Sequence, residues 1–109
     1  MTMPRFGRRW GQVAGPGRPM KPRFIGMEPT VPSFLPTRRI RDSVTIRNPI
    51  ILDFDEFEAL RLVDYEGLTQ QEAAERMKIS RGTVWRCVDS ARKKLVSMLV
   101  EGRALIIRG

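Results

Sequence analysis

The clearest pattern in the chain is a stripe of apolar side chains at helical spacing in its last third. Apolar residues recur at intervals of three or four, at Val84, Cys87, Val88, Ala91, Leu95, Met98 and Leu99. This spacing places them on one face of a helix. Ser80 can cap its start and Gly102 its end. The pattern therefore predicts a long helix from Arg81 to about Glu101.

A shorter helix is predicted over about residues 54–65. Its apolar face is wide and consists of Phe54, Phe57, Leu60, Leu62 and Val63. Two pairs of acidic residues three positions apart fit a helix start, Asp53 with Glu56 and Asp55 with Glu58. Gly67 is the expected stop.

Between these two helices, Thr69-Gln-Gln-Glu72 has the sequence of a capping box, in which hydroxyl and carboxylate each satisfy a backbone amide. The helix that follows, about 70–77, has a small apolar face made of Ala73, Ala74 and Met77.

A short helix, a three-residue turn and a second capped helix have the geometry of a helix-turn-helix. Residues 54–65 supply the third wall, since two helices bury too little surface. The expected fold class is mainly α: a three-helix helix-turn-helix domain with an irregular, Pro-rich basic N-terminal arm. Lys78 stands where the turn usually calls for glycine, which implies a strain of about 1 kcal/mol if the residue is left-handed.

Proline and charge divide the chain near Pro49. All eight prolines lie in residues 1–49, and residues 1–50 hold ten basic and two acidic residues, whereas residues 51–109 hold ten of each. Because prolines interrupt helices, we expect residues 1–49 to be a partly disordered arm and residues 50–109 to be the helix-turn-helix domain.

Part of the arm is apolar enough to dock on the domain. The residues concerned are Phe24, Ile25, Phe34 and Leu35, so residues 23–36 are expected to be ordered although irregular. Two short β-strands are also predicted, at residues 44–47 and 104–108. They could pair within one chain or across a dimer.

Composition narrows the function class. One cysteine and no histidine among 109 residues exclude an internal disulfide, the usual zinc ligand sets, and Ser-His or Cys-His nucleophile pairs. The longest uncharged apolar run, residues 95–100, is far short of the about 20 residues that a membrane span needs. The basic start does not lead into a signal-peptide core. We therefore expect a cytoplasmic protein, not an enzyme, with no membrane segment and no cofactor. Its net charge of +8 suits a polyanionic partner.

Two groups with potential chemistry have structural explanations. Cys87 lies on the apolar stripe and is interpreted as a core residue rather than a reactive thiol. The carboxylates between residues 53 and 58 could suggest a divalent metal, but a helix N-terminus explains their spacing better.

Three stretches of the helical half carry a family resemblance, Leu52–Leu62, Glu66–Ala74 and Met77–Arg81. They resemble a family of small, uncharacterised prokaryotic proteins predicted to bind DNA, whose helical domain is similar to region four of bacterial sigma factors. The resemblance runs from about Gly17 to Arg108 and implies DNA binding with no known target. Two features depart from the family: Lys78 replaces its usual turn glycine, and the arm lacks the cysteines that many members carry.

The start of the long helix holds the candidate site. In a helix-turn-helix this part enters the major groove, so the residues expected to face bases are Arg81, Gly82, Thr83, Trp85 and Arg86. Arg81 or Arg86 could contact guanine through two hydrogen bonds, and Gly82 would permit close approach. Thr69 and Gln70, at the positive end of the preceding helix, are placed for a phosphate. A second candidate phosphate set, which could instead be a solvated face, is Arg92, Lys93 and Lys94.

The sequence thus predicts a protein that binds double-stranded DNA sequence-specifically, a transcriptional regulator that inserts helix 81–94 into the major groove. A homodimer is expected because so small a domain is marginal alone and the apolar tail 99–107 needs cover.

Two alternative functions stay open. A sigma-like domain could dock on a protein such as RNA polymerase, through Trp85 and an apolar surface of Leu99, Val100, Leu105 and Ile107. The arm, with Phe6, Trp10 and Phe24 among its arginines, could bind nucleic acid non-specifically, track a minor groove, or act only as a solubilising tail.

Overall fold

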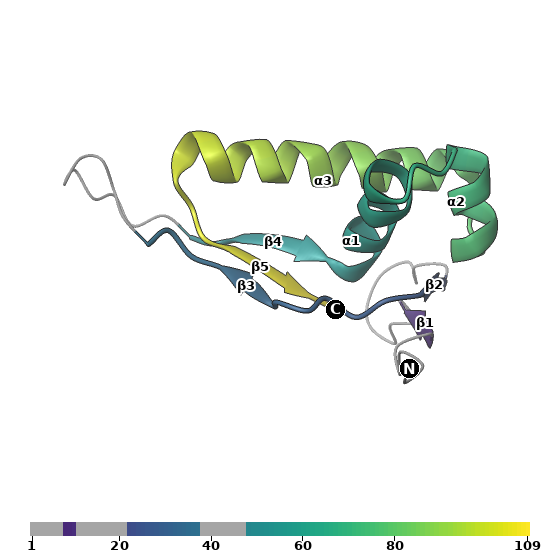
Figure 1. Cartoon of the computed structure of the whole chain (residues 1–109), viewed down its shortest axis with the longest axis horizontal. Helices are drawn as coiled ribbons and strands as arrows, with labels where there is room; N and C mark the ends of the chain where they lie inside the picture. Colours follow the sequence, from purple (N-terminus) through teal and green to yellow (C-terminus); the bar gives the residue numbers. More distant parts are fainter. Residues whose placement is uncertain (1–7, 11–21, 38–47) are drawn as a thin grey trace, which may run out of the picture.

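The computed structural model describes residues 8–10, 22–37 and 48–109 (Figure 1). Its helical elements are α1 (Phe54–Leu60), the π-helical turn η1 (Arg61–Tyr65), α2 (Gln70–Met77) and α3 (Arg81–Glu101). Its strands are β1 (Arg8–Trp10), β2 (Arg23–Ile25), β3 (Ser33–Phe34), β4 (Ile50–Asp53) and β5 (Leu105–Arg108). The expected mainly α class with some strands is confirmed. In these ranges no helix combines the length and apolarity needed to cross a bilayer.

Local capping explains where α2 and α3 begin and end. The Glu72 amide donates to Thr69 Oγ1 at 3.1 Å, and the Thr69 amide donates to the Glu72 carboxylate at 2.9 Å, so the predicted capping box is formed. The Thr83 amide donates to Ser80 Oγ at 3.2 Å. Gly102 ends α3 in a left-handed conformation with a φ of 64°. Both predicted helices are therefore confirmed at their predicted bounds.

The first predicted helix changes its winding midway. The Asp53 amide donates to the Glu56 carboxylate at 2.9 Å, so this pair, of the two proposed, marks the start of α1. The helix then widens into η1, where the Glu66 amide donates to the Arg61 carbonyl at 2.8 Å, and ends at Tyr65 as predicted. No pattern of residues in this stretch predicts the π-helical turn.

The turn between α2 and α3 contains the strain that the sequence suggested. Lys78 is left-handed, with a φ of 58° and a ψ of 44°, which costs a residue with a side chain about 1 kcal/mol. The Lys78 ammonium lies 5.6 Å from the centre of the Phe24 ring. This cation–π contact offsets part of the strain.

A three-stranded sheet of order β3-β5-β4 lies against one side of α3 (Figure 1). β4 is parallel to β5, with Ile50 opposite Leu105, and β3 is antiparallel to β5, with Phe34 opposite Leu105. The strand predicted at residues 104–108 is confirmed, and its partners β3 and β4 were not predicted. The strand predicted at residues 44–47 lies outside the described residues.

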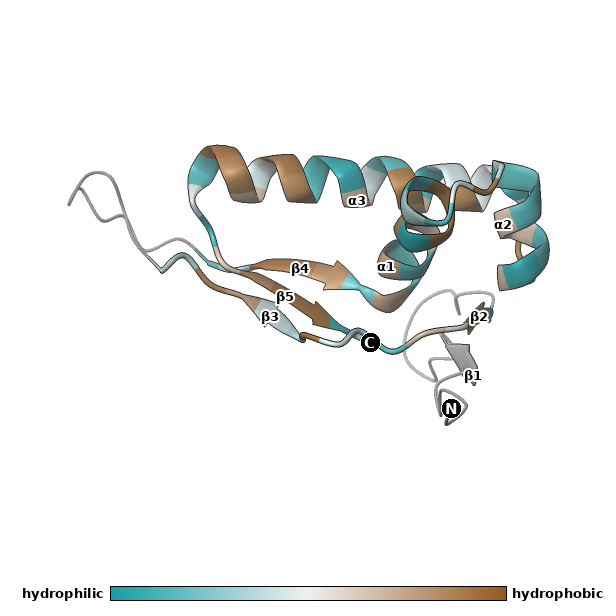
Figure 2. Ribbon diagram, in the orientation of Figure 1, coloured by the Kyte–Doolittle hydropathy of each residue, from teal (hydrophilic) through white to brown (hydrophobic). Residues whose placement is uncertain are grey.

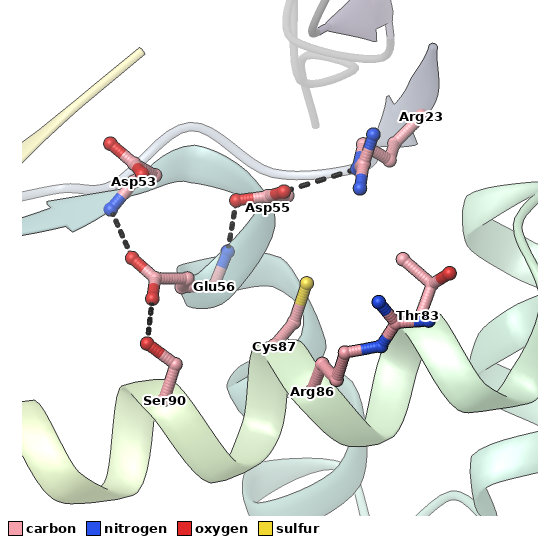
Figure 3. Close-up of a pocket in the computed structure, with 8 residues that line it drawn as sticks. All are labelled: Arg23, Asp53, Asp55, Glu56, Thr83, Arg86, Cys87 and Ser90. Carbon is pink, nitrogen blue, oxygen red and sulfur yellow. Dashed lines mark hydrogen bonds and ion pairs between the residues drawn. The ribbon is translucent and has the colours of Figure 1, made fainter. Parts of the chain in front are cut away.

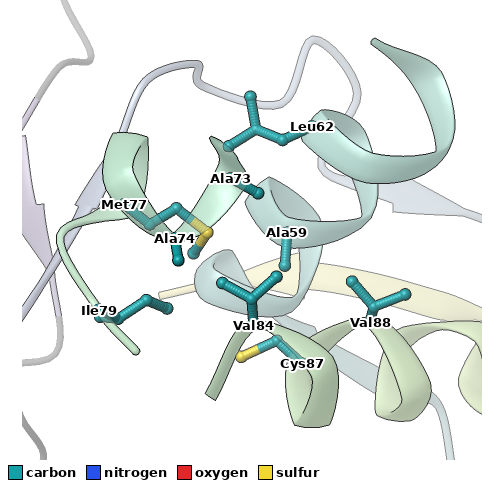
Figure 4. Close-up of a cluster of buried hydrophobic side chains, with 9 residues drawn as sticks. All are labelled: Ala59, Leu62, Ala73, Ala74, Met77, Ile79, Val84, Cys87 and Val88. Carbon is teal, nitrogen blue, oxygen red and sulfur yellow. The ribbon is translucent and has the colours of Figure 1, made fainter. Parts of the chain in front are cut away.

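Two clusters of apolar side chains hold the described elements together. The first joins α1, η1, α2 and the start of α3 (Figure 4) and contains Ala59, Leu62, Ala73, Ala74, Met77, Ile79, Val84, Cys87 and Val88. The second joins α3 to the sheet, where β4 and β5 are strongly apolar (Figure 2), and contains Ile50, Leu52, Ala91, Leu105 and Ile107. Helices thus support the first half of α3, and strands support its second half.

The apolar stripe of α3 was predicted to be one continuous face, and this is wrong at its last position. Leu99 is 77% exposed, although it is in sequence register with the stripe. A residue fifteen positions after Val84 lies about 60° around the helix from it, so Leu99 lies off the buried face of α3. The apolar tail 99–107 was expected to be covered by a second copy of the chain. Leu105 and Ile107 are instead buried by the sheet of their own chain, while Leu99 and Val100 are exposed.

Candidate functional site

The five residues predicted to face bases lie together on the first turns of α3. Arg81, Gly82, Trp85 and Arg86 are exposed, and Thr83 is half-buried. On the opposite side of the same turns, three residues pack into the first apolar cluster, Val84, Cys87 and Val88. The core therefore fixes the orientation of α3 and turns this set of side chains outward.

Arg81 and Arg86 differ in their surroundings from the other basic residues of α3. Neither guanidinium forms an ion pair or hydrogen bond with the residues that the structure describes. Farther along the helix every basic residue has a carboxylate partner: Arg92 binds Asp64 at 2.7 and 2.9 Å, Lys93 lies 3.1 Å from Asp89, and Lys94 lies 2.6 Å from Glu56. Uncompensated positive charge on α3 is thus concentrated at its start.

The second set of candidate phosphate-binding residues, Arg92, Lys93 and Lys94, does not form one positively charged surface. Arg92 reaches η1, and its hydrogen bonds hold the pKa of Asp64 below the usual range. Lys94 reaches the start of α1 instead. Lys93 is the most exposed of the three and pairs only along its own helix. The structure therefore does not bring Arg92, Lys93 and Lys94 to a common surface.

Gly82 has no packing role within the described residues. A Cβ atom built on it would meet no atom within 4 Å, and a glycine in a helix costs about 0.5–1 kcal/mol relative to alanine. Thr83 is partly committed to the helix cap, because its hydroxyl lies 2.8 Å from Ser80 Oγ. Its methyl group takes no part in that contact.

The start of α2 places Thr69 at an exposed position and Gln70 at a half-buried one. The Glu72 carboxylate already accepts the Thr69 amide there. These hydrogen bonds lower the pKa of Glu72. A phosphate at this helix end would therefore meet a carboxylate as well as the Thr69 hydroxyl.

A cavity of about 260 Å³ lies on one flank of the first half of α3 (Figure 3). Residues from β2, from the start of α1 and from α3 line it, namely Arg23, Asp53, Asp55, Glu56, Thr83, Arg86, Cys87 and Ser90. It therefore joins the candidate site to the N-terminal part of the chain.

The carboxylates of this cavity bind groups of their own chain. Arg23 Nε lies 3.0 Å from Asp55 Oδ2, and the two side chains are only 9% and 8% exposed. Burial raises the pKa of Asp55, and the Arg23 charge opposes that rise. Glu56 accepts hydrogen bonds from Ser90 and Lys94. Over the described ranges no group of three or more carboxylates and cysteines is arranged to hold a metal ion.

Cys87 is a buried residue at the floor of the same cavity. Burial, together with the negative charge of Asp55, raises the pKa of its thiol to about 12. A thiol that stays protonated at neutral pH is a poor nucleophile. The prediction that Cys87 belongs to the core is confirmed.

Sequence reasoning missed the ionic contacts that attach β2 to α1. Glu58 is 2% exposed, and its carboxylate accepts the Gly26 amide at 2.9 Å and two hydrogen bonds from Arg61 at 2.9 and 3.0 Å. A signal existed, because Asp55, Glu58 and the buried Leu62 share one helix face at spacings of three and four. This spacing does not indicate that Arg23 and Gly26 are the partners of these carboxylates.

A family model described as "Protein of unknown function DUF134" matches residues 8–109. The chain belongs to the DUF134 family. It is 52% identical to the UPF0251 protein PF0620 of Pyrococcus furiosus over 96% of this chain and 88% of that one. It is 60% identical to the UPF0251 protein PYRAB12660 of Pyrococcus abyssi (78% and 76% covered), and 42% identical to Teth39_0655 of Thermoanaerobacter pseudethanolicus (84% and 75% covered). No solved structure matches the chain.

These relatives confirm the family resemblance at the level of the family, which has members in archaea and bacteria. The DUF134 match starts at Arg8, the first residue of β1. The family's shared sequence therefore covers the basic N-terminal strand as well as the helices.

Proposed function

We propose that this DUF134 protein binds double-stranded DNA and regulates transcription, with α2, the turn and α3 acting as a helix-turn-helix. The observation that carries the proposal is the contrast along α3. Arg81 and Arg86 have no partner among the described residues, while Arg92, Lys93 and Lys94 are each paired with a carboxylate. Unpaired arginines on the outward face of a capped helix suit the major groove, where guanine presents two acceptors.

In this mechanism the segment 81–94 of α3 lies in the major groove. Arg81 or Arg86 donates two hydrogen bonds to guanine, and the Thr83 methyl group contacts a thymine methyl group. Gly82 lets the helix approach the DNA closely, which would explain a glycine that no internal packing requires. Trp85 contributes an apolar contact at the edge of the groove, and Thr69 and Gln70 contact a phosphate. This activity would place the protein in the cytoplasm with the chromosome, and it needs no catalytic step or cofactor.

The test is a selection of binding sites from a random duplex library at about 150 mM salt, where non-specific binding is weak. We expect the wild-type protein to enrich a motif, and Arg86→Ala to lose about 1–3 kcal/mol of discrimination at one position of it. Arg103→Ala is the matched control: it removes the same charge beyond the far end of α3, so the motif should not change. Gly82→Ala should stabilise the protein by about 0.5–1 kcal/mol and still weaken DNA binding.

An absence of enrichment, with binding that simply fades as salt rises, would sink the regulator proposal. It would favour non-specific binding through the basic arm. Docking on RNA polymerase is the other alternative. The apolar surface proposed for that docking is smaller than the sequence predicted, because Leu105 and Ile107 are buried.

The proposal includes a homodimer formed through the second half of α3. Val96, Leu99 and Val100 are exposed apolar residues at spacings of three and four, and a two-fold contact would cover the same stripe on both copies. We expect sedimentation to show a dimer for the wild-type protein and a monomer for Leu99→Lys. Gln71→Lys, which adds the same charge at an exposed position of α2, should remain dimeric. A monomeric wild-type protein at all accessible concentrations would disprove this part.

A further inference from the structure

β2 is attached to the helical part of the molecule by buried and specific contacts. Ile25 is fully buried. The flanking contacts are the ion pair of Arg23 with Asp55 at 3.0 Å and the hydrogen bond from the Gly26 amide to Glu58 at 2.9 Å. A Cβ atom at Gly26 would lie 3.0 Å from the Glu58 carboxylate. The close approach means that β2 has one defined position on α1.

The same strand reaches the turn that precedes α3. The Phe24 ring lies under the Lys78 ammonium, 5.6 Å away, and Lys78 is the left-handed residue of that turn. Arg23 also lines the flank cavity together with Thr83 and Arg86 of α3 (Figure 3). β2 therefore lies directly beside the outward face proposed to read DNA.

β1 extends this strand into a two-stranded ribbon. β1 pairs with β2 in antiparallel register, with Arg8 opposite Ile25 and Trp10 opposite Arg23, and the pair lies beside α2 and the turn (Figure 1). The first 27 residues of the chain contain six basic residues and no acidic one. A strand that carries two consecutive arginines, Arg8 and Arg9, is thus fixed close to the start of α3.

We propose that the β1–β2 ribbon is a second DNA-contacting element, which binds the phosphate backbone beside the major groove entered by α3. This inference rests on the proposed function and extends the site from a single helix to a helix plus a basic ribbon on its flank. The charge of the ribbon suits phosphates, which carry no base sequence. The ribbon therefore adds affinity and fixes orientation, whereas α3 selects the sequence.

The test compares Arg8→Ala/Arg9→Ala with Arg38→Ala/Arg39→Ala, which removes the same charge from the arm segment that follows β3. Each protein is titrated with the selected duplex and with a random duplex over a range of salt, and its hydroxyl-radical footprint is recorded. Each lost phosphate contact should flatten the slope of log Kd against log salt by about 0.9. We expect this for Arg8→Ala/Arg9→Ala only, together with lost backbone protection on one side of an unchanged motif.

A companion variant, Phe24→Ala, tests whether the position of the ribbon matters separately from its charge. It keeps every basic residue but removes the contact with the turn, and we expect it to blur the same flanking protection while circular dichroism shows an intact fold. If neither the salt slope nor the footprint changes in Arg8→Ala/Arg9→Ala, the ribbon inference is overturned while the proposed function stands. If the wild-type protein selects no motif and Arg8→Ala/Arg9→Ala abolishes binding, the proposed function fails, and with it the placement of the ribbon beside a reading helix.

Discussion

Replacing Arg23 by methionine is expected to lower the free energy of unfolding by about 3 kcal/mol at neutral pH, because it leaves a buried carboxylate without its cation. Arg23 and Asp55 are both more than nine-tenths buried. Methionine replaces the apolar stem of arginine but lacks the guanidinium, so the change removes mainly the charge and its hydrogen-bond donors. Urea unfolding of the two proteins measures the difference.

The loss should depend on pH in a defined direction. Burial already raises the pKa of Asp55 in the folded protein, and Arg23 opposes that rise, so the pKa climbs further in Arg23→Met. The folded variant then holds a proton that the unfolded chain has released, and its stability falls as pH rises above the unfolded value of about 4. The deficit should therefore be smaller at pH 5 than at pH 7.5.

The control for this prediction is Lys93→Met. It breaks an exposed pair with Asp89 on the surface of α3, and such pairs contribute under about 0.5 kcal/mol. Equal losses in the two variants, or a loss in Arg23→Met that does not change with pH, would contradict the account of β2 attachment.

Leu62→Ala is expected to lower the free energy of unfolding by about 2–5 kcal/mol, the range for deleting a fully buried leucine side chain. Leu62 is 0% exposed in η1, where it packs into the apolar cluster shared with α2 and α3. A loss of that size is a large fraction of the stability of a small domain. Thermal and urea unfolding would both report it.

Leu35→Ala makes the same chemical change at a position that is 68% exposed. It should alter the stability by no more than about 0.5 kcal/mol. A comparable loss in both variants would mean that the cluster around Leu62 does not dominate the stability of the fold.

The helices could be predicted from the sequence because their signals are local. Thr69 with Glu72, Ser80 with Thr83, and Gly102 each mark a helix end within a few residues of the hydrogen bond they make. The same holds for the outward position of Arg81 and Arg86, which follows from the spacing of the apolar stripe. Caps and periodicity together therefore sufficed for α2 and α3.

The remaining structure depends on contacts between distant residues. Nothing near Ile50 indicates a parallel partner at Leu105, and nothing near Asp55 points to Arg23. The pairing of Lys94 with Glu56 likewise joins residues far apart in the chain, so the sequence alone could not distinguish free from neutralised basic residues on α3. That distinction now separates Arg81 and Arg86 from the rest.

The order of strands in the sheet has a consequence for synthesis on the ribosome. β5 lies between β3 and β4, yet it follows both of them in the chain. The two outer strands emerge from the ribosome first and cannot form this sheet until β5 is translated. The helices, whose hydrogen bonds are local, can form earlier. Released chains that end before residue 105 should therefore hold the α1–α2–α3 cluster without the sheet that supports the second half of α3.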